Sequence, residues 1–101
     1  MNKTFLLTFV PGPNYQTDKS FHDQPYWENH SRFADKLFLQ GKITMCGPLT
    51  DASKTLVVAL GKSESSMRNL FKDDPFIKKG VLILSHVDEW ELHLNPEHIE
   101  E

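Results

Sequence analysis

The stretch from Asp23 to Asp51, DQPYWENHSRFADKLFLQGKITMCGPLTD, combines a helix, a helix stop and the start of a strand. Pro25 suits the first helical position, where its missing N–H costs nothing, and Gly41 suits the left-handed residue that closes a helix. Between them, the apolar residues recur at helical spacing and form one stripe. The members of this stripe are Tyr26, His30, Phe33 and Leu37, with Ala34 and Phe38 beside them. The pattern predicts a helix that rests on a core and carries one histidine on its buried face.

His30 is the polar member of this stripe, and it has two interpretations. A histidine near the start of a helix that packs on a sheet lies where a cleft opens at the sheet edge, and imidazole is an efficient proton carrier near neutral pH. A single histidine on an apolar face is also a common core residue whose ring nitrogens are satisfied by its neighbours. Other residues must decide between the two.

Size and composition restrict the class of protein. The 101 residues fit one domain over 1–101, with 39% hydrophobic and 25% charged residues, as in an ordinary globular protein. The 14 acidic and 11 basic residues give a formal charge of −3, and the basic ones are scattered. Nucleic-acid binding needs clustered positive charge, so it is not expected.

The apolar run from Phe5 to Val10 is too short for a membrane span or a signal-peptide core. The single cysteine, Cys46, permits no internal disulfide, so a cytoplasmic location is expected.

The rest of the chain predicts alternating strands and helices. Lys3–Val10 and Thr55–Leu60 are β-prone and apolar, and Lys42–Cys46 alternates, which predicts Ile43 and Met45 on one face and Thr44 and Cys46 on the other. A second helix is predicted from the N-cap Ser63 to just before Asp73, and a last strand from Val81 to Val87. The run Trp90–Leu94 either continues that strand or adds a small one, and the charged tail from Asn95 is expected to fray.

This order predicts a ferredoxin-like βαββαβ fold, which is a four-stranded antiparallel sheet with two helices on one face. Strands as apolar as 5–10 and 55–60 imply that the other face is covered too. The simplest cover is a second copy of the chain, as a homodimer packed sheet to sheet.

The segment 11–24 is a long polar loop with two isolated aromatics, Tyr15 and Phe21. Long loops inside compact domains are uncommon and often functional. The loop either covers a pocket or is a surface excursion that its aromatics pin down.

Two aspartates are candidate partners for His30. A carboxylate that accepts one ring N–H fixes the tautomer of the imidazole and stabilises its protonated form. Asp51 follows the second strand in a loop and could equally be a turn residue that bonds its own backbone. Asp74 precedes Pro75, so it is expected to be extended, with its carboxylate held at a fixed bend. Its fixed geometry makes Asp74 the better partner.

Neither metal-ligand spacing nor a cofactor motif is recognisable in the sequence, so no metal or cofactor is expected.

The chain resembles the YciI-like (YCII-related) family over nearly its whole length. The resemblance is carried by Tyr26–His30, Gly41, Gly47–Asp51, and Asp73-Asp74-Pro75-Phe76 followed by Lys79-Gly80-Val81. It implies a ferredoxin-like fold of the dimeric α/β-barrel group and a site centred on a histidine and an aspartate. On this sequence those residues are His30 and Asp74. Related proteins of this fold group, a dehydrochlorinase and muconolactone isomerases, imply proton transfer on small oxygenated ring compounds.

Together these features predict a small cofactor-independent enzyme of the isomerase or lyase type, with His30 moving a proton and Asp74 orienting it. Its ligand is expected to be a small oxygenated organic molecule. Backbone N–H groups near Gly47, Leu49 or Thr50 could receive an oxyanion, while Pro48 has no N–H to give. The residues expected to contact the ligand are Tyr15, Trp27, Gly47, Pro48, Leu49, Asp51 and Phe76. The alternatives are a non-catalytic dimeric module that binds a small molecule or assists a partner, and an oxygen-using enzyme of the same fold group.

Overall fold

The computed structural model describes residues 2–94, so the predicted fraying of the tail from Asn95 falls outside the described residues. Strand β1 is Lys3–Pro11, and a 3-10 helix, η1 (Phe21–Asp23), precedes helix α1 (Trp27–Leu39). Strands β2 (Ile43–Pro48) and β3 (Thr55–Gly61) follow, then helices α2 (Glu64–Phe71) and α3 (Pro75–Lys78) and strand β4 (Leu82–Glu89). None of the helices in this range combines the length and apolar character needed to cross a membrane.

The four strands form one antiparallel sheet in the order β2-β3-β1-β4. The first and last strands of the chain are therefore neighbours: Leu7 pairs with Val87 of β4 and with Val57 of β3. This α+β arrangement is compatible with the predicted ferredoxin-like fold.

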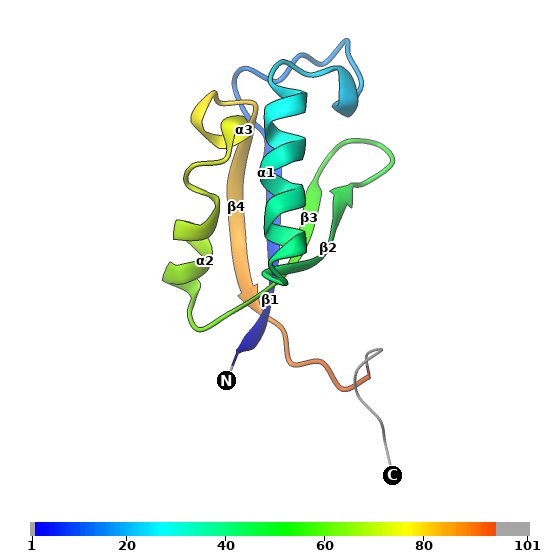
Figure 1. Ribbon diagram of the computed structural model, residues 1–101. Coiled ribbons are helices and arrows are strands. Elements are labelled where there is room, and N and C mark those ends of the chain that lie inside the picture. The colour runs from blue at the N-terminus through cyan, green and yellow to red at the C-terminus, as the bar shows by residue number, and fades with distance from the viewer. Residues whose placement is uncertain (1, 95–101) are drawn as a thin grey trace.

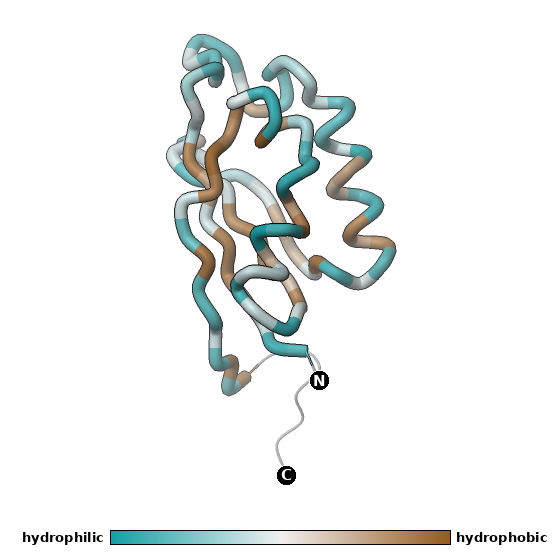
Figure 2. Tube along the Cα trace, turned by 90° about the vertical axis from the view of Figure 1, so that its left-hand side faces the viewer, coloured by the Kyte–Doolittle hydropathy of each residue, from teal (hydrophilic) through white to brown (hydrophobic). Residues whose placement is uncertain are grey.

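The helices lie on one side of the sheet (Figure 1). Figure 2, turned by 90°, shows the sheet to the left and the helices to the right. Alternate residues of β1 and β3 are buried on the helix side, and with the inward residues of the helices they form the core. The core members on the two strands are Phe5, Leu7, Phe9, Val57 and Ala59. The intervening residues, such as Leu6 and Val58, lie on the opposite face, which no helix within residues 2–94 covers.

Helix α1 ends as predicted but begins later. Gly41 has a φ of +73°, and the N–H groups of Gly41 and Lys42 bond the carbonyls of Phe38 and Leu37, so the left-handed stop is confirmed. The prediction that Pro25 is the first helical residue is wrong, because Tyr26 is left-handed (φ 68°) and helix begins at Trp27.

The later start changes which aromatic side chain belongs to the buried stripe. Tyr26 and Phe38 are exposed, contrary to prediction, and the half-buried Trp27 takes the place expected for Tyr26. His30 and Leu37 keep their predicted positions on the inward face.

A bulge in β2 corrects the predicted faces of that strand. Ile43 pairs with Ala59, but the register shifts by one residue before Met45, which pairs with Val58. A one-residue shift moves side chains to the other face of a sheet. Met45 is therefore on the open face, and Cys46, not Met45, shares the helix side with Ile43.

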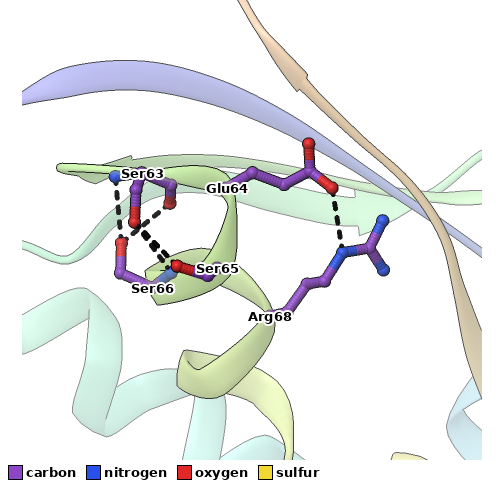
Figure 3. Close-up of polar contacts among 5 residues, drawn as sticks. All are labelled: Ser63, Glu64, Ser65, Ser66 and Arg68. Atoms are coloured by element: carbon purple, nitrogen blue, oxygen red, sulfur yellow. Dashed lines mark hydrogen bonds and ion pairs between the residues drawn. The ribbon is translucent and has the colours of Figure 1, made fainter.

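Helix α2 begins at the predicted cap. The Ser63 hydroxyl accepts the N–H of Ser66, the Ser66 hydroxyl bonds the Ser63 backbone, and Glu64 pairs with Arg68 one turn later (Figure 3). The two bonds between Ser63 and Ser66 satisfy backbone donors that the first turn of a helix leaves without partners.

The chain after α2 adds one helix that the sequence pattern did not predict. Asp74 is extended (φ −60°, ψ 126°), as predicted before a proline, and it caps the single turn of α3. Strand β4 is shifted by one or two residues from the predicted Val81–Val87. Trp90 still donates its N–H to the Thr4 carbonyl, but residues 90–94 are not in a strand.

Candidate active site

His30 and Asp74 are in direct contact, although 44 residues separate them in the chain. Nδ1 of His30 lies 2.9 Å from Oδ1 and 3.0 Å from Oδ2 of Asp74. The side chains are 13% and 2% exposed, respectively. Because an ionised carboxylate can only accept, Nδ1 must carry the proton in the neutral ring, and Nε2 then presents its lone pair. The contact selects the tautomer that is a proton acceptor at Nε2.

The backbone of α3 fixes the position of Asp74. Oδ1 of Asp74 accepts the N–H of Phe76 at 2.9 Å, and the Asp74 carbonyl accepts the N–H groups of Ile77 and Lys78. A buried carboxylate is costly unless its oxygens are hydrogen-bonded, and this one is bonded on both sides, by a helix N-terminus and by an imidazole. Its geometry therefore cannot change without breaking the cap of α3.

An aromatic cluster holds the imidazole of His30. The ring stacks on Phe76 with centroids 4.1 Å apart and planes within 8°. Phe21 stands edge-on to the same imidazole at 6.1 Å, and Trp27 lies 5.7 Å away. Rings packed on its face and edge leave the imidazole little rotational freedom. The tautomer and the orientation of His30 are thus both set before any ligand arrives.

A cavity of about 200 Å³ opens beside His30, bounded by α1, the edge strand β2, and η1. This is smaller than the roughly 300–1,000 Å³ of pockets that take drug-sized ligands, so it fits a compact molecule. Its walls are mainly apolar, with four histidines and aspartates and, among the described residues, no lysine or arginine. The full lining is Phe9, Phe21, His22, Trp27, His30, Ser31, Ala34, Asp35, Ile43, Cys46, Gly47, Pro48, Thr55, Val57, Phe71, Asp74 and Leu82.

The structure brings only part of the predicted ligand-contacting set to this cavity. Trp27, Gly47 and Pro48 line it, and Phe76 supports it from behind through the stack on His30. Leu49 and Asp51 are not among the lining residues.

Asp51 is not the partner of His30. Its Oδ1 accepts the hydroxyl of Ser53 at 2.7 Å and the N–H of Ser53 at 2.9 Å. These bonds, the hydroxyl first, lower the pKa of the fully exposed Asp51. Asp51 is therefore the turn residue that was the alternative interpretation, and the contact with His30 belongs to Asp74.

Tyr15 lies outside the cavity lining as well. It packs against the hydrophobic core, and its hydroxyl is buried without a hydrogen-bond partner in the described residues.

The loop 11–24 is both tied down and part of the cavity wall. Gln24, 3% exposed, bonds the backbone of Gln16 through both ends of its amide and reaches the carbonyls of Lys19 and Ser20. This closure turns Phe21 into the core beside His30. Both interpretations of the loop are thus correct in part: an aromatic pins it, and the same aromatic lines the cavity.

Sequence reasoning missed several cavity residues. His22 adjoins Phe21, Asp35 follows the inward stripe of α1 one turn beyond Ser31, and the bulge in β2 turns Cys46 inward. Burial, and secondarily the negative charge of Asp35, raises the pKa of the Cys46 thiol, which lowers its thiolate fraction near neutral pH. The spacing of Asp35 from Trp27 and Ser31, at helical intervals along one face of α1, is the available signal for that residue.

No group of three or more histidine, cysteine, aspartate or glutamate side chains is placed to hold a metal ion in the part of the chain that the structure describes. Comparison of the chain with protein-family models and with curated proteins found no match.

Proposed function

We propose that this protein is a small cytoplasmic enzyme that catalyses proton transfer on a compact oxygenated organic molecule, with isomerisation or elimination as the overall reaction and without a cofactor. His30 accepts and returns the proton at Nε2, and Asp74 positions the ring. The observation that carries the proposal is the 2.9 Å contact between Asp74 and His30 Nδ1 at the wall of an apolar cavity. The carboxylate on Nδ1 leaves the Nε2 lone pair as the proton acceptor, which is the arrangement that a general base needs.

The reaction follows from the two ends of the imidazole. The Nε2 lone pair removes a proton from a carbon next to a carbonyl or enol group, and the positive charge that forms on the ring is stabilised by Asp74. The same Nε2–H then returns the proton to another carbon, or the electron pair expels a leaving group. The backbone N–H groups of Gly47 and Leu49, expected to receive an oxyanion, are engaged in the β2–β3 hairpin, because Leu49 donates to the Lys54 carbonyl and Gly47, two residues earlier in the same ladder, pairs with Leu56.

Membership of the YciI-like family and of the dimeric α/β-barrel group is part of this proposal. It is supported by the strand order β2-β3-β1-β4 and by the contact between the two residues that the resemblance selects, His30 and Asp74.

The catalytic proposal is tested by solvent deuterium exchange. A panel of small cyclic enones and unsaturated lactones is incubated in deuterated buffer with the wild type, His30→Gln and, as a matched control, the exposed His93→Gln. We expect exchange or double-bond migration with the wild type and the control. His30→Gln should be slower by about 10²- to 10⁴-fold, the usual contribution of a general base. Exchange at the wild-type rate in His30→Gln would show that His30 is not the base. Saturable binding without exchange in the wild type would favour the non-catalytic binding module.

The homodimer is supported by the open face of the sheet. Its apolar side chains come from all four strands, and an exposed apolar surface of this kind is typical of a protein interface. They are Leu6, Val10, Met45, Leu56, Val58, Leu60 and Ile83. A sheet-to-sheet pairing of two copies would bury these side chains.

Light scattering should give twice the chain mass for the wild type and one chain mass for Val58→Glu. Leu39→Glu, on the exposed side of α1, should remain dimeric, and a monomeric wild type would contradict the proposal.

A further inference from the structure

His22 lies at the mouth of the cavity in a position that its loop fixes. Within η1, Phe21 enters the core and the next side chain, His22, lines the cavity. The imidazole stands edge-on to Trp27 with centroids 4.6 Å apart, and edge-on to Phe21 at 6.0 Å. The buried amide of Gln24 closes the loop immediately after it. The position of His22 is therefore set by the core and by buried hydrogen bonds.

The ring nitrogens of His22 have no protein partner among the described residues. The other histidines in residues 2–94 each have one: Asp74 for His30, Ser85 for His86, and Glu91 for His93. His22 is exposed and lines the cavity, so the one donor and one acceptor of its neutral ring are free for a ligand.

The two cavity histidines share the same aromatic wall. Trp27 contacts His22 at 4.6 Å and His30 at 5.7 Å, and Phe21 lies about equally far from both imidazoles, at 6.0 and 6.1 Å. Both imidazoles also line the cavity. A cavity of about 200 Å³ holds one planar ring of a ligand and little more.

We propose that His22 is a second ligand-contacting residue of this cavity, and that the site selects single-ring compounds with two polar substituents over those with one. The inference rests on the proposed function only in placing one of these substituents at His30. His22 donates to, or accepts from, the second substituent.

The test compares phenol with resorcinol, which adds one hydroxyl to the same ring and is likewise uncharged near neutral pH. Binding to the full chain is followed by NMR through the Trp27 indole N–H and the ring nitrogens of His22 and His30. In the wild type, resorcinol should bind about three- to tenfold more tightly than phenol, the gain expected from one added hydrogen bond. In His22→Phe, which keeps an aromatic ring against Trp27, this ratio should fall to about one, with phenol affinity within about twofold of the wild type. His22→Gln should restore part of the ratio, and His93→Phe should leave it unchanged.

Each other result overturns the inference. A ratio that survives in His22→Phe would show that the second hydroxyl does not contact His22. Equal weakening of both compounds would show that His22 only supports Trp27, and no saturable binding of either would exclude this ligand class. The His30 signals separate the two proposals: if resorcinol shifts His22 but not His30, the proposed function loses its ligand while the His22 contact stands.

Discussion

The carboxylate of Asp74 bonds two groups at once, Nδ1 of His30 and the N–H of Phe76, each at 2.9 Å. The residue that orients the imidazole is therefore also the cap of α3. Two substitutions separate these roles, because asparagine keeps an acceptor for the cap and loses the charge, whereas alanine loses both.

Asp74→Asn should fold with little loss of stability but release the tautomer of His30, because the amide offers both a donor and an acceptor to Nδ1. Nitrogen NMR of the ring should show one tautomer in the wild type and a mixture in the variant. Asp74→Ala should lose about 2–4 kcal/mol of unfolding free energy, from the cap and from the partner that His30 Nδ1 loses. A single unchanged tautomer in Asp74→Asn would contradict an orienting role for the carboxylate.

Asp35→Asn should make Cys46 more reactive. The negative charge of Asp35 is the second cause of the raised pKa of this thiol, so its removal lowers the pKa and increases the thiolate fraction at fixed pH. Because Asp35 is exposed and its charge is screened, we expect a two- to fivefold faster reaction with a disulfide reagent, as an order of magnitude. Asp88→Asn, an equal charge change on β4, should leave the rate unchanged. A slower reaction in Asp35→Asn would reverse the assigned sign.

Ser53→Ala should raise the pKa of Asp51, because the Ser53 hydroxyl is the first cause of its lowering. A lowered native-state pKa stabilises the fold above the pKa of the unfolded chain, and this stabilisation is lost as pH falls through the native-state value. The wild type should therefore be the more stable protein at neutral pH, with the difference disappearing in acid.

Urea unfolding at several pH values, together with carboxyl-carbon NMR of Asp51, measures both effects. Thr50→Ala, which removes a neighbouring hydroxyl that has no bond to Asp51 in the described structure, is the control. An unchanged Asp51 titration in Ser53→Ala would remove the hydroxyl as the cause.

Two glycines should differ in their tolerance of alanine. Gly41 is left-handed with open space around its Cβ position, so Gly41→Ala should cost about 1–2 kcal/mol from backbone strain alone. At Gly12, whose N–H bonds the Val81 carbonyl, an added Cβ would overlap the backbone oxygen of Gly80. Gly12→Ala should cost about 3 kcal/mol or more, because backbone must move to make room. Urea unfolding of both variants checks the order, and a larger loss in Gly41→Ala would contradict it.

The candidate pair could be named from sequence, but not all of its surroundings. Pro75 fixes the bend at Asp74 and so predicts this residue as the partner, and the contact with His30 agrees with that prediction. Leu49 and Asp51 were expected at the ligand but lie outside the cavity, because the turn of Asp51 bonds within itself. The sequence pattern did not predict that His22 lines the cavity, because a histidine in a polar loop has no periodic spacing that would place it there.

The sequence by itself determined the features that depend on neighbours a few residues away. Gly41 ends α1, Ser63 begins α2, and Pro75 extends Asp74, each through steric or hydrogen-bonding effects within one turn of chain. Periodicity also determined the order of the four strands and of α1 and α2, but not the single turn of α3. The tertiary structure decided that Trp27, not Tyr26, faces the core, that β2 bulges before Met45, and that Asp74 meets His30. These outcomes depend on packing between segments far apart in the chain, which local spacing does not encode.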